Sequence, residues 1–140
     1  MAAPARALLS DLPKGHEFPP ATLTLTPEAV LRYLDAVEDG NAIYLERGLA
    51  PPLCAAASAL GALLELLELP AGTLHTGQEV DVRGGVQIGA QLTLTGRIAQ
   101  RSERAGMVIC ALEFALTPAG SRAPALAGRT TVLAPAGVAT

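Results

Sequence analysis

Aromatic residues are scarce in this chain of 140 residues, which has no tryptophan, two tyrosines and two phenylalanines. Proteins that bind single-stranded nucleic acids stack the bases on aromatic side chains, and proteins that bind duplexes present basic surfaces. A formal net charge of −3 gives no such basic surface. The composition therefore argues against a nucleic-acid partner. It also means that the core has to be built mainly from Ala, Leu, Val and Ile.

Cysteine is rare as well, and long uncharged apolar runs are absent. Cys54 and Cys110 lie inside apolar segments without metal-ligand spacing, so we expect reduced core thiols and no metal site. The longest apolar run, Leu53 to Leu69, contains two glutamates and is too short to cross a bilayer. The first twelve residues have no apolar stretch of signal-peptide length. We therefore expect a cytoplasmic protein without a membrane partner.

Half of the residues are apolar, which is enough for one sizeable core. The length is typical of a single domain. We expect a loose N-terminal segment or one short element over residues 1–14, a single domain over residues 15–135, and a C-terminal tail over residues 136–140.

A strand and a helix are expected first. The segment from His16 to Leu25 ends in β-type alternation of Leu and Thr. Thr26 is a favoured N-cap residue, and Pro27 suits the first helical position. Apolar residues then follow at helical spacing to about Glu38. We expect this helix to stop near Asp39 and Gly40, with the glycine in a left-handed cap.

A second helix is expected after an irregular loop over residues 39–52. The tandem prolines Pro51 and Pro52 open it, and we expect it to run from about Leu53 to Leu69. Its first three turns are Ala- and Leu-rich on all sides, and a helix without a polar face has to be covered on every side. Two glutamates, Glu65 and Glu68, are expected to mark its solvated end.

The remainder of the chain predicts β-structure separated by turn signals. Four consecutive strands with short turns predict an antiparallel sheet. The simplest arrangement is an α+β fold in which this curved sheet wraps around the apolar helix, which is the hot-dog fold. The expected strands are Leu74–Arg83, Gln91–Arg101, Met107–Thr117 and Ala125–Leu133.

The segment from Tyr33 to Ala50 resembles the hydratase motif of MaoC-like proteins and (R)-specific enoyl-CoA hydratases. That motif runs from an aromatic residue through small residues to Gly-Asp-x-Asn-Pro-aliphatic-His, with a small residue six positions later. Asp39 falls on the catalytic Asp, Asn41 on the orienting Asn and Ala50 on the small residue. The aliphatic-Ala-Pro-Pro segment at Leu49 to Pro52 is most similar to the dehydratase domains named after the fungal fatty-acid synthase.

The chain departs from this motif at several positions. Tyr44 stands where the catalytic His is expected, Glu38 replaces the Gly before the Asp, and Ala42 replaces the Pro. Ala90 stands where the family usually has an Asp after Gly89. The tyrosine matters most, because a side chain with a pKa of about 10 is protonated at neutral pH and is a poor base. Loss of a general acid–base group typically costs about 10²–10⁴ in rate.

The resemblance implies where a substrate binds and what chemistry it meets. Hydration of a 2-enoyl thioester adds water at C3 and a proton at C2, and it places enolate-like charge on the thioester oxygen. Backbone N–H groups from Leu53 to Ala55, at the start of the central helix, are expected to stabilise that oxyanion. No cofactor is implied beyond the CoA or phosphopantetheine that forms part of the substrate. The implied substrate-binding residues are Ala50, Pro51, Pro52, Leu53 and Cys54, and the implied catalytic residues are Asp39, Tyr44 and Asn41.

The favoured hypothesis is therefore a protein that binds an acyl-CoA or acyl-carrier-protein thioester and catalyses (de)hydration weakly or only with a partner. Three alternatives stay open: an active lyase with a rewired Asp39–Tyr44 site, a hot-dog thioesterase, and a structural subunit without a ligand. The thioesterase ranks lower because no acidic residue lies between Ala50 and Leu64. The Asp39–Asn41 cluster is also a common turn former, without any catalytic role.

Hot-dog sheets usually join edge to edge, and pairing removes an exposed strand edge. We therefore expect a homodimer, or a heteromeric assembly with a catalytic hydratase subunit. His16 and His75 are expected to be strand-end or surface residues. Phosphates of CoA have four candidate partners, which are Arg83, Arg97, Arg101 and Arg104.

Overall fold

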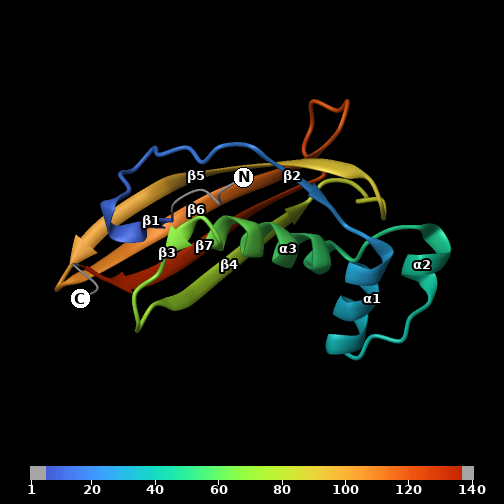
Figure 1. Ribbon diagram of the computed structural model, residues 1–140, viewed down its shortest axis with the longest axis horizontal. Coiled ribbons are helices and arrows are strands. Elements are labelled where there is room, and N and C mark those ends of the chain that lie inside the picture. The colour runs from blue at the N-terminus through green and yellow to red at the C-terminus, as the bar shows by residue number, and fades with distance from the viewer. Residues whose placement is uncertain (1–5, 137–140) are drawn as a thin grey trace.

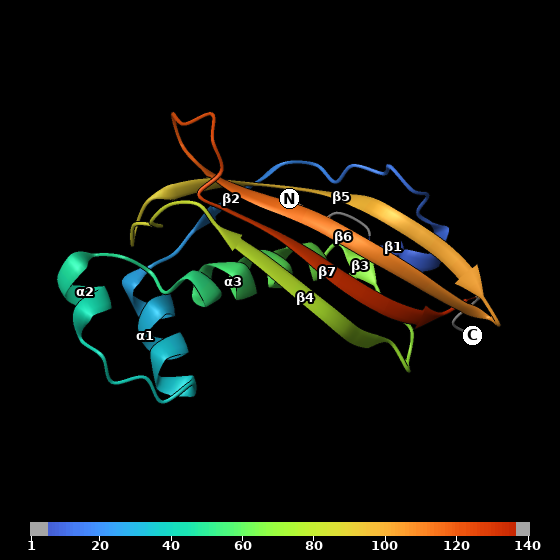
Figure 2. The same ribbon diagram turned by 180° about the vertical axis from the view of Figure 1, so that it is seen from behind.

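A computed structural model describes residues 6–136 of the chain (Figure 1). A curved five-stranded antiparallel sheet wraps around one side of helix α3, and the view from behind gives the same arrangement (Figure 2). The expected α+β architecture is confirmed. The elements in chain order are β1 (Ala7–Leu8), η1 (Leu9–Asp11), β2 (Ala21–Thr24), α1 (Pro27–Ala36), α2 (Ile43–Arg47), α3 (Pro52–Leu64), β3 (Leu67–Glu68), β4 (Leu74–Val82), β5 (Gln91–Arg104), β6 (Met107–Pro118) and β7 (Leu126–Pro135).

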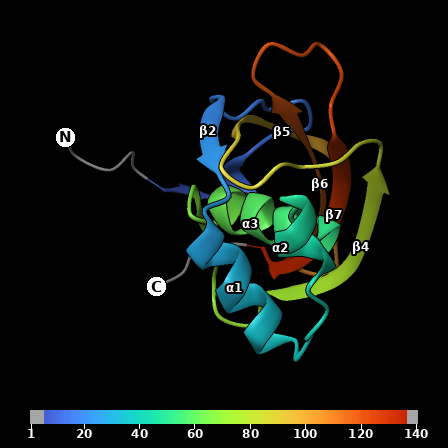
Figure 3. The same ribbon diagram turned by 90° about the vertical axis from the view of Figure 1, so that its right-hand side faces the viewer.

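The strand order of the sheet is β2-β5-β6-β7-β4. β4 pairs with the last strand, β7, and not with β5, its successor in the chain. Residues 83–90 therefore cross from one side of the sheet to the other, over the end of α3 nearest α1 and α2 (Figure 3). The sequence predicted antiparallel strands correctly but did not reveal this crossing, which brings the connection against the start of α3.

The four long strands begin and end close to their predicted bounds. The largest difference is in β5, which continues to Arg104 because Ala105 and Gly106 form the turn, with φ values of 52° and 77°. Alternate residues of the strands face α3 and form the core. Fully buried members of this face include Leu92, Ile98, Leu112, Leu116 and Leu126.

Two glycines allow close packing on this inner face. A Cβ atom at Gly96 would lie 2.8 Å from Cδ2 of Leu63, so the missing side chain leaves room for Leu63 of α3 against β5. A Cβ atom at Gly128 would overlap the ring of Phe114, which lies across the neighbouring strand. The aromatic ring of Phe114 therefore takes the place of two side chains, because its cross-strand neighbours are Gly96 and Gly128.

The first helix starts as predicted but ends differently. Oγ1 of Thr26 accepts a hydrogen bond from the N–H of Ala29 at 3.1 Å, which confirms the N-cap. The helix ends at Ala36, and the prediction that Gly40 takes the left-handed position is wrong. Glu38 has that conformation, with φ of 56°. The Asp39 amide closes the end by donating to the carbonyl of Leu34, as in a Schellman motif.

Two further expectations are corrected. The loop over residues 39–52 contains the short helix α2. Helix α3 ends at Leu64 and not at Leu69, because residues 67–68 pair in parallel with residues 7–8. Residues 6–14 of the expected N-terminal segment contain β1 and η1, and Leu9 is completely buried. Residues 1–5 of that segment and residues 137–140 of the expected C-terminal tail lie outside the described residues. The exposed positions of Glu65 and Glu68 agree with the expected solvated end.

The sheet covers only one side of α3. Cys54, Ala55, Ala56, Ala59 and Leu63 are buried, whereas Leu53 is 60% exposed and Ala57 and Gly61 are exposed as well. The expectation that the chain covers this helix on every side is therefore wrong. Cys54 and Cys110 are free and buried, which confirms the prediction of core thiols. Within residues 6–136, no helix is long and apolar enough to span a membrane.

Candidate functional site

A cavity of about 480 Å³ lies at the start of α3, where α2, the end of β4 and the crossing connection meet. Of the residues implied by the sequence, Tyr44, Ala50 and Pro52 line it. The complete lining is Ile43, Tyr44, Arg47, Leu49, Ala50, Pro52, Val82, Arg83, Gly84, Gly85, Val86 and Leu126. Its volume falls within the range of small-molecule sites.

Backbone pairing holds the walls of this cavity together. The N–H of Ala50 donates to the carbonyl of Val86 at 2.8 Å, and the N–H of Ile88 donates to the carbonyl of Gly48, also at 2.8 Å. Gly85 lies so close to Leu49 that a Cβ atom there would be 3.1 Å from the leucine Cδ2. The segment that leads into α3 is therefore fixed to the connection between β4 and β5.

The side chains of Asp39 and Asn41 accept hydrogen bonds from backbone amides two residues further along the chain. Oδ1 of Asp39 accepts from the N–H of Asn41 at 3.0 Å, and Oδ1 of Asn41 accepts from the N–H of Ile43 at 3.0 Å. These two Asx turns lead the chain from α1 into α2. Asp39 does not line the cavity that Tyr44 lines. The catalytic roles of Asp39 and Asn41 stay predictions.

Tyr33 is a neighbour of these residues to which the sequence motif gives no role in the site. Its pKa is raised above the usual value, first by burial and then by the negative charges that Cys54, Tyr44 and Asp39 would carry. The pKa of the Cys54 thiol is also raised by burial, so this thiol stays protonated at neutral pH. Tyr33 lies next to Leu34 and three residues after Val30, the two buried residues of α1, and this helical spacing was the available signal that Tyr33 faces inward.

The start of α3 offers fewer free amides than expected. Pro51 and Pro52 have no N–H group, and the N–H groups of Cys54 and Ala55 both donate to the carbonyl of Pro51, at 3.0 and 3.2 Å. The prediction that the amides from Leu53 to Ala55 can stabilise an oxyanion is therefore wrong for two of the three. The Leu53 amide makes no hydrogen bond with another group of the described residues.

Neither histidine lies at the cavity. The His75 ring is exposed and its Nε2 lies 2.9 Å from the carbonyl oxygen of Gly77 on β4. His16 is half-buried and packs edge-to-face against Phe18. These positions agree with the expectation that both are strand-end or surface residues.

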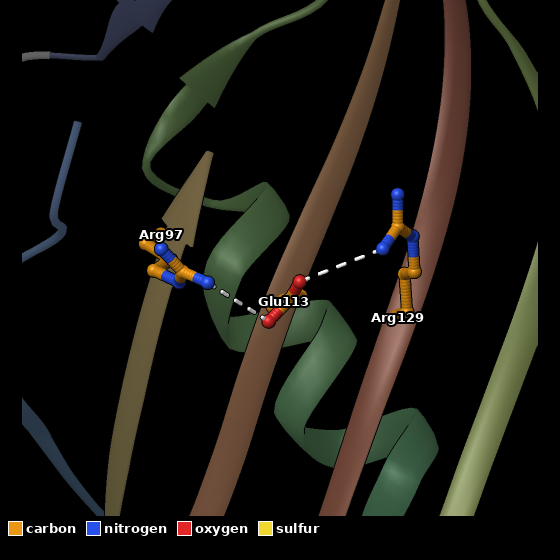
Figure 4. A network of polar contacts seen from close by, with 3 residues as sticks. All are labelled: Arg97, Glu113 and Arg129. Atoms are coloured by element: carbon orange, nitrogen blue, oxygen red, sulfur yellow. Dashed lines mark hydrogen bonds and ion pairs between the residues drawn. The ribbon is translucent and has the colours of Figure 1, made fainter. Parts of the chain in front are cut away.

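The arginines considered for phosphate binding differ in their surroundings. On the outer face of the sheet, Glu113 lies between Arg97 and Arg129, at 3.3 and 3.5 Å (Figure 4). Arg101 donates to the carbonyl of Ser10 at 2.7 Å. Arg83 lines the cavity. Arg97 and Arg101 are thus engaged by the protein itself.

No protein-family model matches the chain, and no curated protein is significantly similar to it in sequence. Similarity appears among solved structures. The R-hydratase PhaJ1 from Pseudomonas aeruginosa has a TM-score of 0.73 and 15% identity, with 94% of this chain and 88% of that chain covered. The MaoC-like dehydratase from Rhodospirillum rubrum has a TM-score of 0.73 and 14% identity, with 94% and 98% covered.

The HadBC complex from Mycobacterium tuberculosis, a 3R-hydroxyacyl-ACP dehydratase, is similar as well. Its TM-score is 0.66 at 17% identity, with 86% of this chain and 96% of that chain covered. Likeness at these identities concerns the backbone, and it agrees with the strand order and central helix described above. The chain has the hot-dog fold that MaoC-like dehydratases and (R)-hydratases share.

Proposed function

We propose that this chain binds acyl thioesters carried by CoA or acyl-carrier protein, as a hot-dog protein of the MaoC-like hydratase and dehydratase type. Its own hydration of 2-enoyl thioesters, or dehydration of 3-hydroxyacyl thioesters, is weak or depends on a partner subunit. No cofactor is needed beyond the CoA or phosphopantetheine of the substrate.

The observation that carries this proposal is the cavity at the start of α3, which Tyr44 lines and Asp39 does not. The reaction needs a base that takes a proton from water near neutral pH. A tyrosine hydroxyl is protonated there and can donate a hydrogen bond, but it does not replace a histidine as base. Oδ1 of Asp39 accepts a hydrogen bond from the Asn41 amide, and Asp39 does not line the cavity. The cavity thus suits binding better than catalysis.

A second subunit is supported by the exposed edge of the sheet. Among residues 6–136, strand β4 pairs on one side only, with β7, so its other edge is open to pairing. Leu74 on this strand is 56% exposed and Leu53 on α3 is 60% exposed. We propose a homodimer through this edge, or a heteromer with a catalytic subunit. The HadBC dehydratase is a complex of this heteromeric kind.

Sedimentation of the purified chain tests the assembly. Leu74→Asp should shift a dimer towards monomer, because it places a charge on the proposed interface. Ile109→Asp is the matched control, because Ile109 is also exposed but lies on the inner strand β6. Equal effects of the two substitutions would contradict the proposed edge.

Thioester binding and turnover test the function. Hexanoyl-CoA should raise the melting temperature, because a ligand that binds only the folded state stabilises it. Crotonyl-CoA hydration by the isolated chain should be about 10²–10⁴ times slower than by an Asp–His hydratase, and Tyr44→His should raise it. Robust turnover by the isolated chain that Asp39→Ala abolishes would overturn weak or partner-dependent catalysis.

One observation favours a rewired lyase as the second candidate. Tyr44 and Asp39 are near enough to Tyr33 for their negative charges to raise its pKa. In such an enzyme Tyr44→Phe abolishes turnover, and Tyr44→His does not restore it. The two tyrosine substitutions therefore separate a decayed hydratase from a rewired one.

A further inference from the structure

We propose that Arg47 and Arg83 bind an oxyanion of the ligand inside the cavity at the start of α3. The ligand is then an amphipathic anion, whose apolar part packs on the cavity wall while its phosphate or carboxylate contacts the two guanidinium groups. This inference rests on the proposed function, because it names a charged group that the bound thioester carries.

The charge of the lining supports an anion. None of the described residues that line the cavity is acidic, whereas Arg47 and Arg83 are both cationic at any physiological pH. The remaining lining is apolar or glycine, apart from the hydroxyl of Tyr44. Apolar walls with a few convergent polar groups are typical of small-molecule sites.

The two arginines also keep donors free. Arg47 makes no ion pair or side-chain hydrogen bond with any group in residues 6–136. Arg83 uses Nε on Asp81, at 2.8 Å, which leaves both of its Nη atoms for a ligand. A guanidinium has five N–H donors and binds carboxylate and phosphate in pairs of hydrogen bonds. Arg97 and Arg101, in contrast, already hold protein oxygens with their Nη atoms.

The position of Arg47 supports an anion bound in the same cavity that Tyr44 lines. Arg47 follows Tyr44 by three residues on α2, so both side chains lie on the same helical face and line the same cavity. Arg83 reaches the cavity from the start of the crossing connection. An oxyanion between them has two sources in a thioester: the phosphate of the carrier arm, or a carboxylate on the acyl group.

Three thioesters distinguish these sources by isothermal titration calorimetry. Hexanoyl-pantetheine has no anion, hexanoyl-4′-phosphopantetheine adds a phosphate, and adipoyl-pantetheine adds an acyl carboxylate. At least one of the two anionic thioesters should bind about tenfold more tightly than hexanoyl-pantetheine. Arg47→Ala, Arg83→Ala and the double variant should remove this gain, whereas the affinity for hexanoyl-pantetheine should fall much less, by the packing of the arginine stem alone. Arg104→Ala, an exposed arginine at the far hairpin, should change nothing.

Each result decides the inference. Equal affinities of the three thioesters for the unchanged chain, or equal losses for all three in Arg47→Ala, would overturn it. If no thioester binds the unchanged chain, the proposed function fails, and hexyl phosphate and hexanoate are compared with hexanol. Tighter binding of either anion, lost in Arg47→Ala, then supports the oxyanion site. Equal binding of the anions and the alcohol rejects it.

Discussion

Asp39 and Asn41 are joined by a hydrogen bond in which the backbone N–H of Asn41 donates to Oδ1 of Asp39, at 3.0 Å. The bond needs an acceptor oxygen on the side chain but not a negative charge. Asparagine offers the same oxygen and alanine offers none. The turn and the charge of Asp39 can therefore be separated by substitution.

Asp39→Asn should leave the free energy of unfolding within about 0.5 kcal/mol of the original value. Asp39→Ala should lower it by about 1 kcal/mol, because the Asn41 amide loses its partner. Urea unfolding measures both. If Asp39→Asn lowers the free energy of unfolding as much as Asp39→Ala does, the charge of Asp39 stabilises the fold. That result would contradict the interpretation that Asp39 acts only as the acceptor of the turn.

Glu38→Gly should stabilise the chain by about 1 kcal/mol, since Glu38 holds a φ of 56° that costs little only for glycine. Gly40 provides the matched control. Its φ is not positive and no atom lies within 4 Å of a Cβ placed there, so Gly40→Ala should leave the stability unchanged or raise it by about 0.5 kcal/mol. Thermal unfolding of both variants tests the assignment, and the opposite ranking would refute it.

Gly128→Ala should destabilise the fold by about 1–3 kcal/mol, because the new methyl group overlaps the ring of Phe114. Gly96→Ala should cost less, because it meets the flexible end of Leu63. In a Phe114→Leu background the cost of Gly128→Ala should shrink. A double-mutant cycle measures this coupling, and strictly additive losses would contradict the contact.

Stability should fall in alkaline solution. Burial raises the pKa values of Cys54 and Cys110, and in Cys110 the nearby Arg101 opposes this only in part. The thiols of the unfolded chain therefore lose their protons at lower pH than those of the folded chain. Their contribution to the free energy of unfolding is fully present at neutral pH and declines above about pH 8.5. Urea unfolding at increasing pH measures the slope. Replacing both cysteines by alanine should flatten it, and an unchanged slope would assign the decline to other groups.

Local rules predicted the elements whose ends are fixed by local chemistry. The cap at Thr26 and Pro27, and the strands with strict alternation, depend on neighbours in the sequence and were found where expected. The left-handed conformation of Glu38 was not predicted, because the preference of glycine for positive φ made Gly40 the better candidate for that position. The end of the second helix at Leu64 was not predicted either, because residues 65–69 favour a helix. Residues 67–68 form a strand through their pairing with residues 7–8.

The same distinction applies to the residues around the cavity. Tyr44, Ala50 and Pro52 line one cavity beside the start of α3, as their closeness in sequence suggests, and the roles that the motif implies for them stay predictions. Arg83 and Val86 reach the cavity through the crossing connection, which no local pattern indicates. The loss of the Cys54 and Ala55 amides to the carbonyl of Pro51 is likewise a matter of bond geometry, which a sequence motif does not contain.

The pairing of β4 with β7 has a consequence for biosynthesis. Strand β4 leaves the ribosome before β5 and β6 are made. At that stage it has no strand to pair with, because among residues 6–136 its partner is the last strand, β7. The hairpin of β5 and β6 closes through local contacts and can form early. The wall of the cavity that contains Val82 and Arg83 is therefore completed last, and a chain that lacks residues 126–135 would lack the strand that holds this wall in place.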